Sequence, residues 1–120
     1  MTPFSLAQVD LIAARARALG DGTRVRILTA LGRGEQAVGR IADDIRIQQS
    51  TTSKHLQVLF HAGLVRRRRD AATVIYRLTA PDLLKWLRYL GRDQITKKRA
   101  TRTGSVRPPA GSAASRRRRA

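Results

Sequence analysis

The sequence contains no cysteine. This absence excludes disulfide bonds, thiolate metal sites and redox sensing through a thiol. No apolar run approaches the roughly 20 residues that a bilayer-spanning helix needs, and the N-terminus lacks the basic and then apolar pattern of a signal peptide. We therefore expect a cytoplasmic protein with no membrane partner.

Catalytic motifs are also missing. Neither His55 nor His61 has a nucleophile and an acid at motif spacing, and there is no glycine-rich phosphate loop. Asp43 and Asp44 are the only adjacent acidic pair, and neighbouring residues of a helix point about 100° apart and do not share a site. We therefore expect neither an enzyme nor a bound cofactor.

Acidic residues are scarce. The 120 residues hold 25 Lys and Arg against 8 Asp and Glu, which gives a formal net charge of +17. Such an excess of positive charge predicts a polyanionic partner, either nucleic acid or an anionic membrane surface, and no amphipathic anchor for a membrane accompanies the charge. Residues 1–91 carry +8 of this charge and residues 92–120 carry +9.

The chain changes character near residue 91. Residues 1–91 have periodic apolar positions, whereas residues 92–120 mix Thr, Ser, Gly and Pro with dispersed Lys and Arg and cannot bury enough apolar surface to become ordered. We predict one folded domain over residues 1–91 and a disordered basic tail over residues 92–120. A flexible tail of this length has an r.m.s. span on the order of 30 Å, which reaches flanking phosphates of a bound duplex.

The folded part is predicted to be mainly α-helical with a small β-hairpin. Thr2 and Pro3 are the expected start of the first helix, and Asp21 is the expected cap of the second. The apolar period and the turn residues place helices over residues 2–20, 21–31, 38–44 and 49–62, strands over 64–69 and 73–78, and a helix after Pro81. This order, α-α-α-α-β-β-α, predicts a winged helix-turn-helix.

The fourth predicted helix is the candidate DNA-reading element. Leu56, Leu59, Phe60 and Leu64 recur at steps of three and four residues and predict one buried stripe. The opposite side has no acid and carries the hydrogen-bonding groups and the cation that meet base edges and phosphates in a major groove. A polar face of this kind is also common on solvated helices, so the period alone leaves DNA binding open. The candidate residues are Gln49, Ser50, Thr51, Ser53, Lys54 and Gln57.

The hairpin after this helix is predicted to be a wing. Its first strand contains Arg66, Arg67, Arg68 and Arg69, with two side chains on each face because side chains alternate along a strand. Both faces of a thin ribbon can touch a phosphate backbone. All four arginines are therefore candidate phosphate contacts.

The first and last predicted helices carry a large apolar load. These residues either cap a small core or form a contact between two copies of the chain, and the second interpretation predicts a homodimer. The candidate interface residues are Phe4, Val9, Ile12, Ala16, Leu83, Leu84, Leu87 and Leu90.

The order of elements and several segments resemble the ArsR/SmtB family of winged-helix repressors. The resemblance covers about residues 10–92 and implies a homodimer whose reading helices enter successive major grooves of a pseudo-palindromic operator. It also adds His55, which matches a histidine usual in that helix, to the candidate DNA-binding residues. The matching segments are residues 19–28 (LGDGTRVRIL), 41–42 (IA), 49–59 (QSTTSKHLQVL), 62–65 (AGLV) and 76–78 (YRL).

Departures from the family concern the effector and the turns. Metal-sensing members place a cysteine pair near the third helix, where this chain has EQAVG at residues 35–39, and others use Asp and His on the last helix, where Asp82 has no later histidine. We therefore expect no metal site of the family type. Arg46 stands where glycine is usual, and the wing turn also lacks its usual glycine. Thr52 replaces a valine that is usual in the family, so the Thr52 hydroxyl needs a hydrogen-bond partner.

The leading hypothesis is a homodimeric, sequence-specific transcriptional repressor that binds double-stranded DNA at the nucleoid. The alternative is an architectural, nucleoid-associated protein in which the basic tail dominates binding and sequence is hardly read. The sequence does not indicate the operator, the genes controlled, the effector or the choice between repression and activation.

Overall fold

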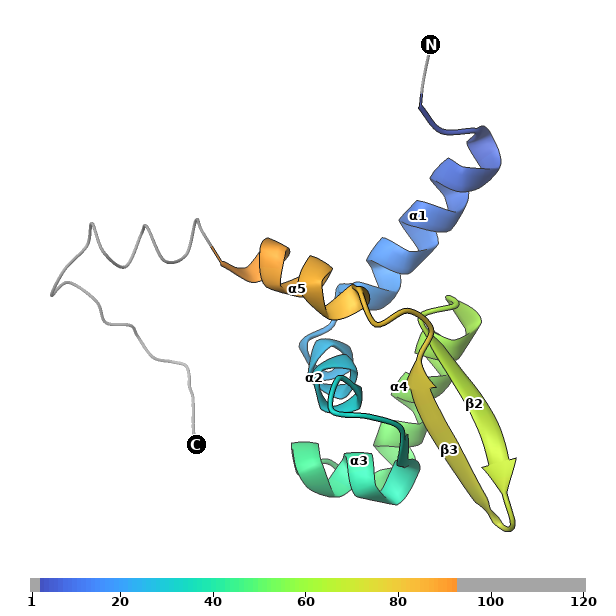
Figure 1. Ribbon diagram of the computed structural model, residues 1–120, viewed down its shortest axis with the longest axis vertical. Coiled ribbons are helices and arrows are strands. Elements are labelled where there is room, and N and C mark those ends of the chain that lie inside the picture. Colours follow the sequence, from blue (N-terminus) through green and yellow to red (C-terminus); the bar gives the residue numbers. More distant parts are fainter. Residues whose placement is uncertain (1–2, 93–120) are drawn as a thin grey trace, which may run out of the picture. The chain divides into compact units, whose positions relative to one another are not determined.

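The computed structural model describes residues 3–92, and the chain divides into two compact units after Leu84. The expected order of a winged helix-turn-helix is confirmed, with one strand more than the sequence predicted (Figure 1). The predicted basic tail lies outside the described residues apart from Arg92, and the predicted domain boundary at residue 91 stays a prediction. The elements are α1 (Leu6–Leu19), α2 (Gly22–Leu31), β1 (Gln36–Ala37), α3 (Val38–Ile45), α4 (Gln49–His61), β2 (Val65–Asp70), β3 (Thr73–Leu78) and α5 (Leu83–Gly91).

Helix α1 begins later than the Thr2–Pro3 pair predicted. Ser5 is its N-cap, because the Ser5 hydroxyl accepts a hydrogen bond from the Gln8 backbone N–H at 3.1 Å and the Gln8 side chain accepts one from the Ser5 N–H at 2.8 Å. This reciprocal pair satisfies two N–H groups at the helix start. Helix α2 starts as predicted, since Asp21 accepts from the Arg24 N–H at 3.1 Å, and this bond lowers the pKa of the Asp21 carboxyl.

The core lies where α2, α3 and α4 meet the hairpin. Ile27, Leu28, Ile41, Leu56 and Leu59 have no exposed surface. Burying a side chain of this size contributes on the order of 1.5–3 kcal/mol. The remaining buried apolar residues are Ala18, Ala30, Leu31, Ala42, Ile45, Leu64, Val65 and Tyr76.

The hairpin belongs to a three-stranded antiparallel sheet in the order β1-β3-β2. Strand β1 pairs Gln36 with Tyr76 and Ala37 with Ile75, and the Gln36 side-chain amide donates to the Ala30 carbonyl of α2 at 3.0 Å. The sequence analysis missed this strand because two residues carry no recognisable alternation. The strand holds the middle of β3 beside the start of α3.

Three arginines are bonded to backbone carbonyls at helix ends. Arg15 Nε donates to the Ala62 carbonyl at 3.0 Å, and Arg24 Nε donates to the Ala18 carbonyl at 2.7 Å. Arg26 donates in the same way to the Ile45 carbonyl. Cations at helix C-termini satisfy unpaired carbonyls and interact favourably with the helix dipole. Part of the arginine surplus therefore stabilises the fold.

Two non-glycine residues adopt left-handed backbone conformations. Arg46, which stands where the family usually has glycine, ends α3 with φ 60°, and Ala71 lies in the two-residue wing turn with φ 56°. A Cβ atom in this region costs roughly 1–2 kcal/mol. Each position therefore stores strain that a glycine would relieve.

Replacing Ala71 by glycine is expected to stabilise the protein by about 0.5–1 kcal/mol, because relief of the strain exceeds the added entropy of the unfolded chain. The midpoint of thermal unfolding, measured at a fixed protein concentration, should rise by about 2–6 °C. The matched control is Ala72→Gly, since Ala72 is not among the positive-φ residues and should gain nothing. Equal midpoints for the two variants would contradict the assignment of strain to Ala71.

Candidate nucleic-acid interface

Helix α4 presents a polar face because its other side is locked into the core. Thr52, Leu56 and Leu59 have no exposed surface, and the Thr52 hydroxyl is satisfied by donating to the Gln48 carbonyl at 2.9 Å. The prediction that the Thr52 hydroxyl needs a hydrogen-bond partner is thus confirmed. Gln49, Ser50, Thr51, Lys54 and Gln57 are exposed on the helix and Ser53 is half-buried.

The N-cap residue of α4, Gln48, makes no side-chain capping bond. The first-turn N–H groups of an uncapped helix, together with the positive end of the dipole, favour phosphate. The Gln49 side chain lies against Gly39 of α3, where an added Cβ would be only 3.3 Å from Gln49 Oε1. The close approach of α3 therefore restricts where the Gln49 amide can lie.

His55 does not share the exposed face. It is half-buried, and its Nδ1 atom lies 3.4 Å from Nη1 of Arg24 on α2. This contact joins the reading helix to α2. A direct contact from His55 to DNA stays a prediction.

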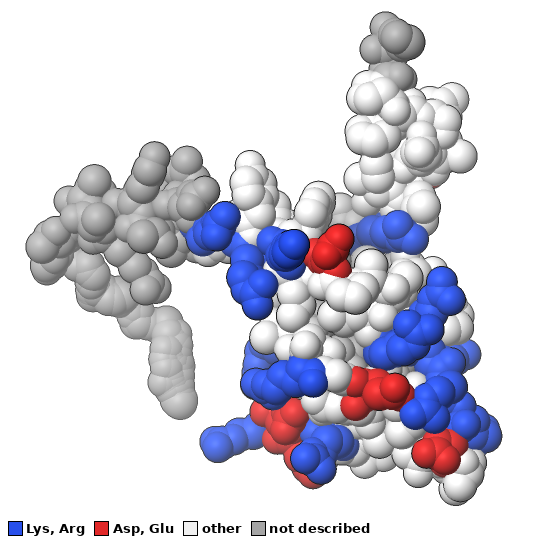
Figure 2. Space-filling view, in the orientation of Figure 1, with Lys and Arg blue, Asp and Glu red and all other residues white. Residues whose placement is uncertain are grey.

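The four wing arginines have different surroundings. The Arg67 guanidinium lies over the Phe60 ring at 3.8 Å from its centroid, and Arg68 donates to one Glu35 carboxylate oxygen through Nε at 3.0 Å and Nη2 at 2.6 Å. Arg66 is exposed opposite Arg77 in the hairpin register, which places like charges side by side. Arg69 is exposed near the turn. Figure 2 shows Lys and Arg side chains along the hairpin.

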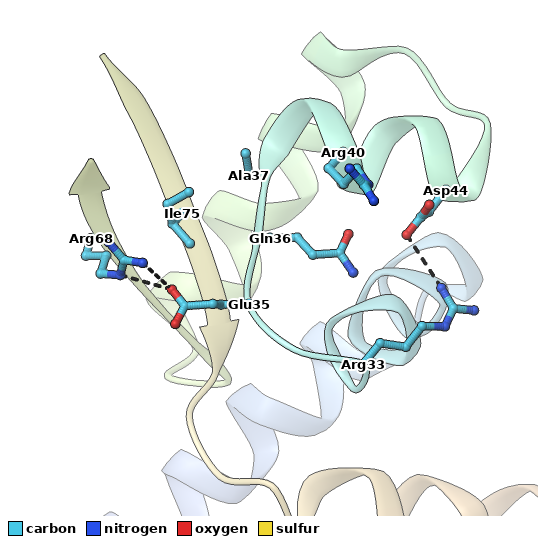
Figure 3. A pocket seen from close by; sticks show the side chains of 8 residues that line it. All are labelled: Arg33, Glu35, Gln36, Ala37, Arg40, Asp44, Arg68 and Ile75. Atoms are coloured by element: carbon cyan, nitrogen blue, oxygen red, sulfur yellow. Dashed lines mark hydrogen bonds and ion pairs between the residues drawn. The ribbon is translucent and has the colours of Figure 1, made fainter. Parts of the chain in front are cut away.

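The Glu35–Arg68 pair borders a cleft between the start of α3 and the sheet (Figure 3). The cleft has a volume of about 710 Å³ and holds a second ion pair, Arg33 to Asp44, at 3.5 Å. Both pairs are largely exposed, and pairs of this kind contribute at most about 1 kcal/mol. The remaining lining residues are Gln36, Ala37, Arg40 and Ile75.

The predicted dimer residues lie mainly at the surface. Phe4, Val9 and Ile12 are 46–49% exposed, and Ala16 is also exposed. Leu84 differs, because a Cβ added at Gly32 would lie 2.0 Å from the Leu84 Cδ1 atom, so this side chain packs on the glycine. In α5 no residue is fully buried; Leu83 and Leu87 are half-buried, and Trp86, Tyr89 and Leu90 are 57–65% exposed.

Sequence reasoning missed the residues that hold the interface in place. Arg15, Arg24, Arg26 and Glu35 each position an element of the helix-turn-helix or the wing. Three of the four bind backbone carbonyls, whose positions carry no signal in a sequence. Within residues 3–92 no helix has the length and hydropathy of a membrane span, and no three His, Cys, Asp or Glu side chains gather as a metal site would require.

Comparisons with known proteins agree with this geometry. The sequence pattern described as "bacterial regulatory protein, arsR family" matches residues 21–67. The chain is 41% identical over 76 residues to the HTH-type transcriptional regulator KmtR of Mycobacterium tuberculosis, covering 63% of this chain and 58% of that protein. It is 31% identical over 94 residues to the transcriptional activator HlyU of Vibrio cholerae, covering 75% of this chain and 87% of HlyU.

A solved structure is similar over most of the chain. The solution structure of the homodimeric winged helix-turn-helix DNA-binding domain of Mb0332 from Mycobacterium bovis superimposes with a TM-score of 0.66 at 29% sequence identity. The match covers 90% of this chain and 100% of that domain. It supports the same fold independently of the sequence pattern.

Replacing Glu35 by glutamine is expected to release Arg68 for a phosphate. Affinity for a duplex should rise, and the slope of log K against log salt should steepen by about 0.9, the value for one added phosphate contact. The measurement is binding to a labelled duplex between about 50 and 200 mM salt. Asp43→Asn removes the same charge from an exposed residue of α3 that makes no ion pair within residues 3–92. If the two variants have the same slope, Glu35 does not restrain Arg68.

Proposed function

The chain belongs to the ArsR family of bacterial regulatory proteins, whose members are DNA-binding transcriptional regulators rather than enzymes, and we propose that it acts as a homodimeric repressor on an inverted-repeat operator. The observation that carries the proposal is the acid-free polar face of α4, which is exposed while the opposite stripe is buried. Each copy would place α4 in a major groove, with half-sites about one helical turn apart.

The proposed contacts divide into base readers and phosphate binders. Gln49, Ser50, Thr51, Ser53 and Gln57 have the amide and hydroxyl groups that pair with base edges. Cations fix the register on the backbone without reading sequence. Lys54, Arg66 and Arg69 are exposed and would bind phosphates directly, whereas Arg67 and Arg68 would first leave Phe60 and Glu35.

The second copy is proposed to bind the apolar residues of α1 and α5. In α1, Val9, Leu11 and Ile12 are 44–47% exposed, and Leu6 is 85% exposed. Contiguous exposed apolar surface on a small domain marks a protein interface more often than a solvated face. The homodimeric state of the Mb0332 domain supports a homodimer here.

Repression would follow from excluding polymerase at an overlapping promoter. The relative HlyU is described as an activator, so the position of the operator relative to the promoter decides the sign of regulation. A regulator of this kind acts on the chromosome, so we place the protein at the nucleoid.

An architectural role remains the second candidate because residues 92–120 carry a net charge of +9. Binding dominated by such a segment would be steeply salt-dependent and nearly independent of sequence. A specific regulator instead keeps its preference for one sequence when salt removes the non-specific component.

Replacing Ser53 and Lys54 together by alanine is expected to reduce the preference for a selected operator over a scrambled duplex by roughly 10- to 100-fold, since a lost base contact costs about 1–3 kcal/mol of discrimination. The lost Lys54 contact to phosphate should weaken binding to both duplexes by the same factor. The ratio of dissociation constants for the two duplexes measures this preference. Lys85→Ala removes the same charge outside α4 and should leave the ratio unchanged. An unchanged ratio in the double variant would refute the role of α4.

Replacing Val9 and Ile12 by aspartate is expected to give a folded monomer, because the side chains are exposed in one copy and two unpaired carboxylates would be buried in the interface. Sedimentation velocity at about 10 μM measures the state, well above the Kd of a stable dimer. Ala7→Asp, about 160° around α1 from Val9, is the control. A double variant that remains dimeric would exclude this face of α1 from the interface.

A further inference from the structure

Arg15 connects α1 to the far end of the reading helix. The residue is half-buried, and its Nε donates to the carbonyl of Ala62, the C-cap residue of α4, at 3.0 Å. The two residues are 47 positions apart in the chain. The bond therefore joins the helix proposed to contact a second copy with the helix proposed to contact DNA.

The Ala62 carbonyl is available because of the way in which α4 ends. Gly63 has φ 79°, its N–H bonds to the Phe60 carbonyl at 2.9 Å, and the Leu64 N–H bonds to the Leu59 carbonyl at 3.0 Å. These two bonds form the Schellman closure of a helix. They leave the Ala62 carbonyl outside the closure, where it accepts a charge-assisted bond from a cation at the negative end of the helix dipole.

The space around Gly63 is shaped by the same guanidinium. A Cβ at Gly63 would lie 3.0 Å from Arg15 Nη2 and within 3.8 Å of Nε and Cζ. Immediately after it, Leu64 and Val65 are buried, and the Leu64 carbonyl accepts from the Thr79 N–H at 3.1 Å. Arg15 therefore lies at the joint between the reading helix and the wing.

Helix α1 has two different halves. Its first half carries the exposed Val9, Leu11 and Ile12, while its second half holds Arg15 and the buried Ala18, whose carbonyl is bonded to Arg24 of α2. Figure 1 shows the first half extending away from α2, α3 and α4. Arg15 follows Ile12 by less than one turn of α1. A second copy bound to the first half of α1 therefore contacts the same helix whose second half is bonded to α4 through Arg15.

We infer that Arg15 is a positioning residue that transmits dimer contacts on α1 to the joint between α4 and β2, so that assembly of the dimer and reading of the operator favour each other. The inference rests on the proposed function, because it assigns the α1 face to a second copy and α4 to DNA. Coupling of this kind is reciprocal: operator DNA would tighten the dimer by the same factor by which dimer formation tightens operator binding.

The test compares three variants of the full-length chain. Arg15→Met removes the donor and the charge but keeps the length of the side chain. Arg15→Lys keeps a cation that reaches a carbonyl by a different geometry. Arg17→Met is the matched control, because Arg17 is exposed on the same helix and makes no side-chain hydrogen bond within residues 3–92, so that the variant removes the same charge without breaking a bond.

The first measurement is amide hydrogen exchange at Gly63 and Leu64, whose N–H groups close the end of α4. Exchange should be about 10-fold faster in Arg15→Met, in proportion to one lost hydrogen bond to a charged donor, and unchanged in Arg17→Met. Arg15→Lys should restore most of the protection. If Arg15→Met fails to fold, Arg15→Lys is judged by the same two amides. Equal exchange in Arg15→Met and Arg17→Met would overturn the inference.

The second measurement is operator preference and its link to assembly. In Arg15→Met, the dissociation constant for the scrambled duplex divided by that for the operator should fall about 10-fold. In Arg17→Met, binding to both duplexes should weaken by the same factor. The tightening of the dimer by operator DNA, measured by sedimentation, should fall by the same factor in Arg15→Met. A wild-type chain without any operator preference would refute the proposed function. A wild-type preference that Arg15→Met retains in full would refute the role of Arg15 alone.

Discussion

The rotation of α4 about its own axis is fixed by three side chains with no exposed surface, Thr52, Leu56 and Leu59. They recur at steps of four and three residues, so together they anchor nearly two turns of the helix to α2, α3 and the hairpin. Any slip of this stripe would turn the polar residues away from solvent and bury them without partners. The face offered to DNA is therefore a consequence of core packing, and Thr52 takes part because its hydroxyl is bonded to the Gln48 carbonyl.

Arginine side chains stabilise the fold and are also the candidate phosphate contacts. In a chain with 25 basic and 8 acidic residues, carboxylate partners are too few, and Arg15, Arg24 and Arg26 instead bind carbonyls at the ends of α4, α1 and α3. A guanidinium keeps its charge when half-buried and offers several donors, so it suits these sites better than lysine. Net charge alone consequently overstates the number of groups that are free to contact phosphate.

Elements with a strong local signal were predictable from the sequence. The periodic stripe of α4 and the turn residues between the expected elements predicted the helix-turn-helix and the hairpin. The start of α1 was wrong because the Ser5–Gln8 capping pair was passed over for Thr2 and Pro3. Strand β1 was missed because two residues show no period.

The candidate interface was predictable only in part. The exposed residues of α4 follow from helical geometry, but alternation along β2 does not reveal that Arg67 lies over Phe60 or that Arg68 binds Glu35. The contact of His55 with Arg24 also depends on packing between α4 and α2. These partners come from distant parts of the chain, so tertiary structure decides which cations remain free.

The central claim is that two copies of α4 read one inverted repeat. The most direct measurement is selection of bound fragments from a random DNA pool by the full-length chain at about 150 mM salt, where non-specific binding is weakened. The account predicts a short inverted repeat with half-site centres about 10–10.5 base pairs apart. Enrichment of no motif would contradict it and would favour binding dominated by charge.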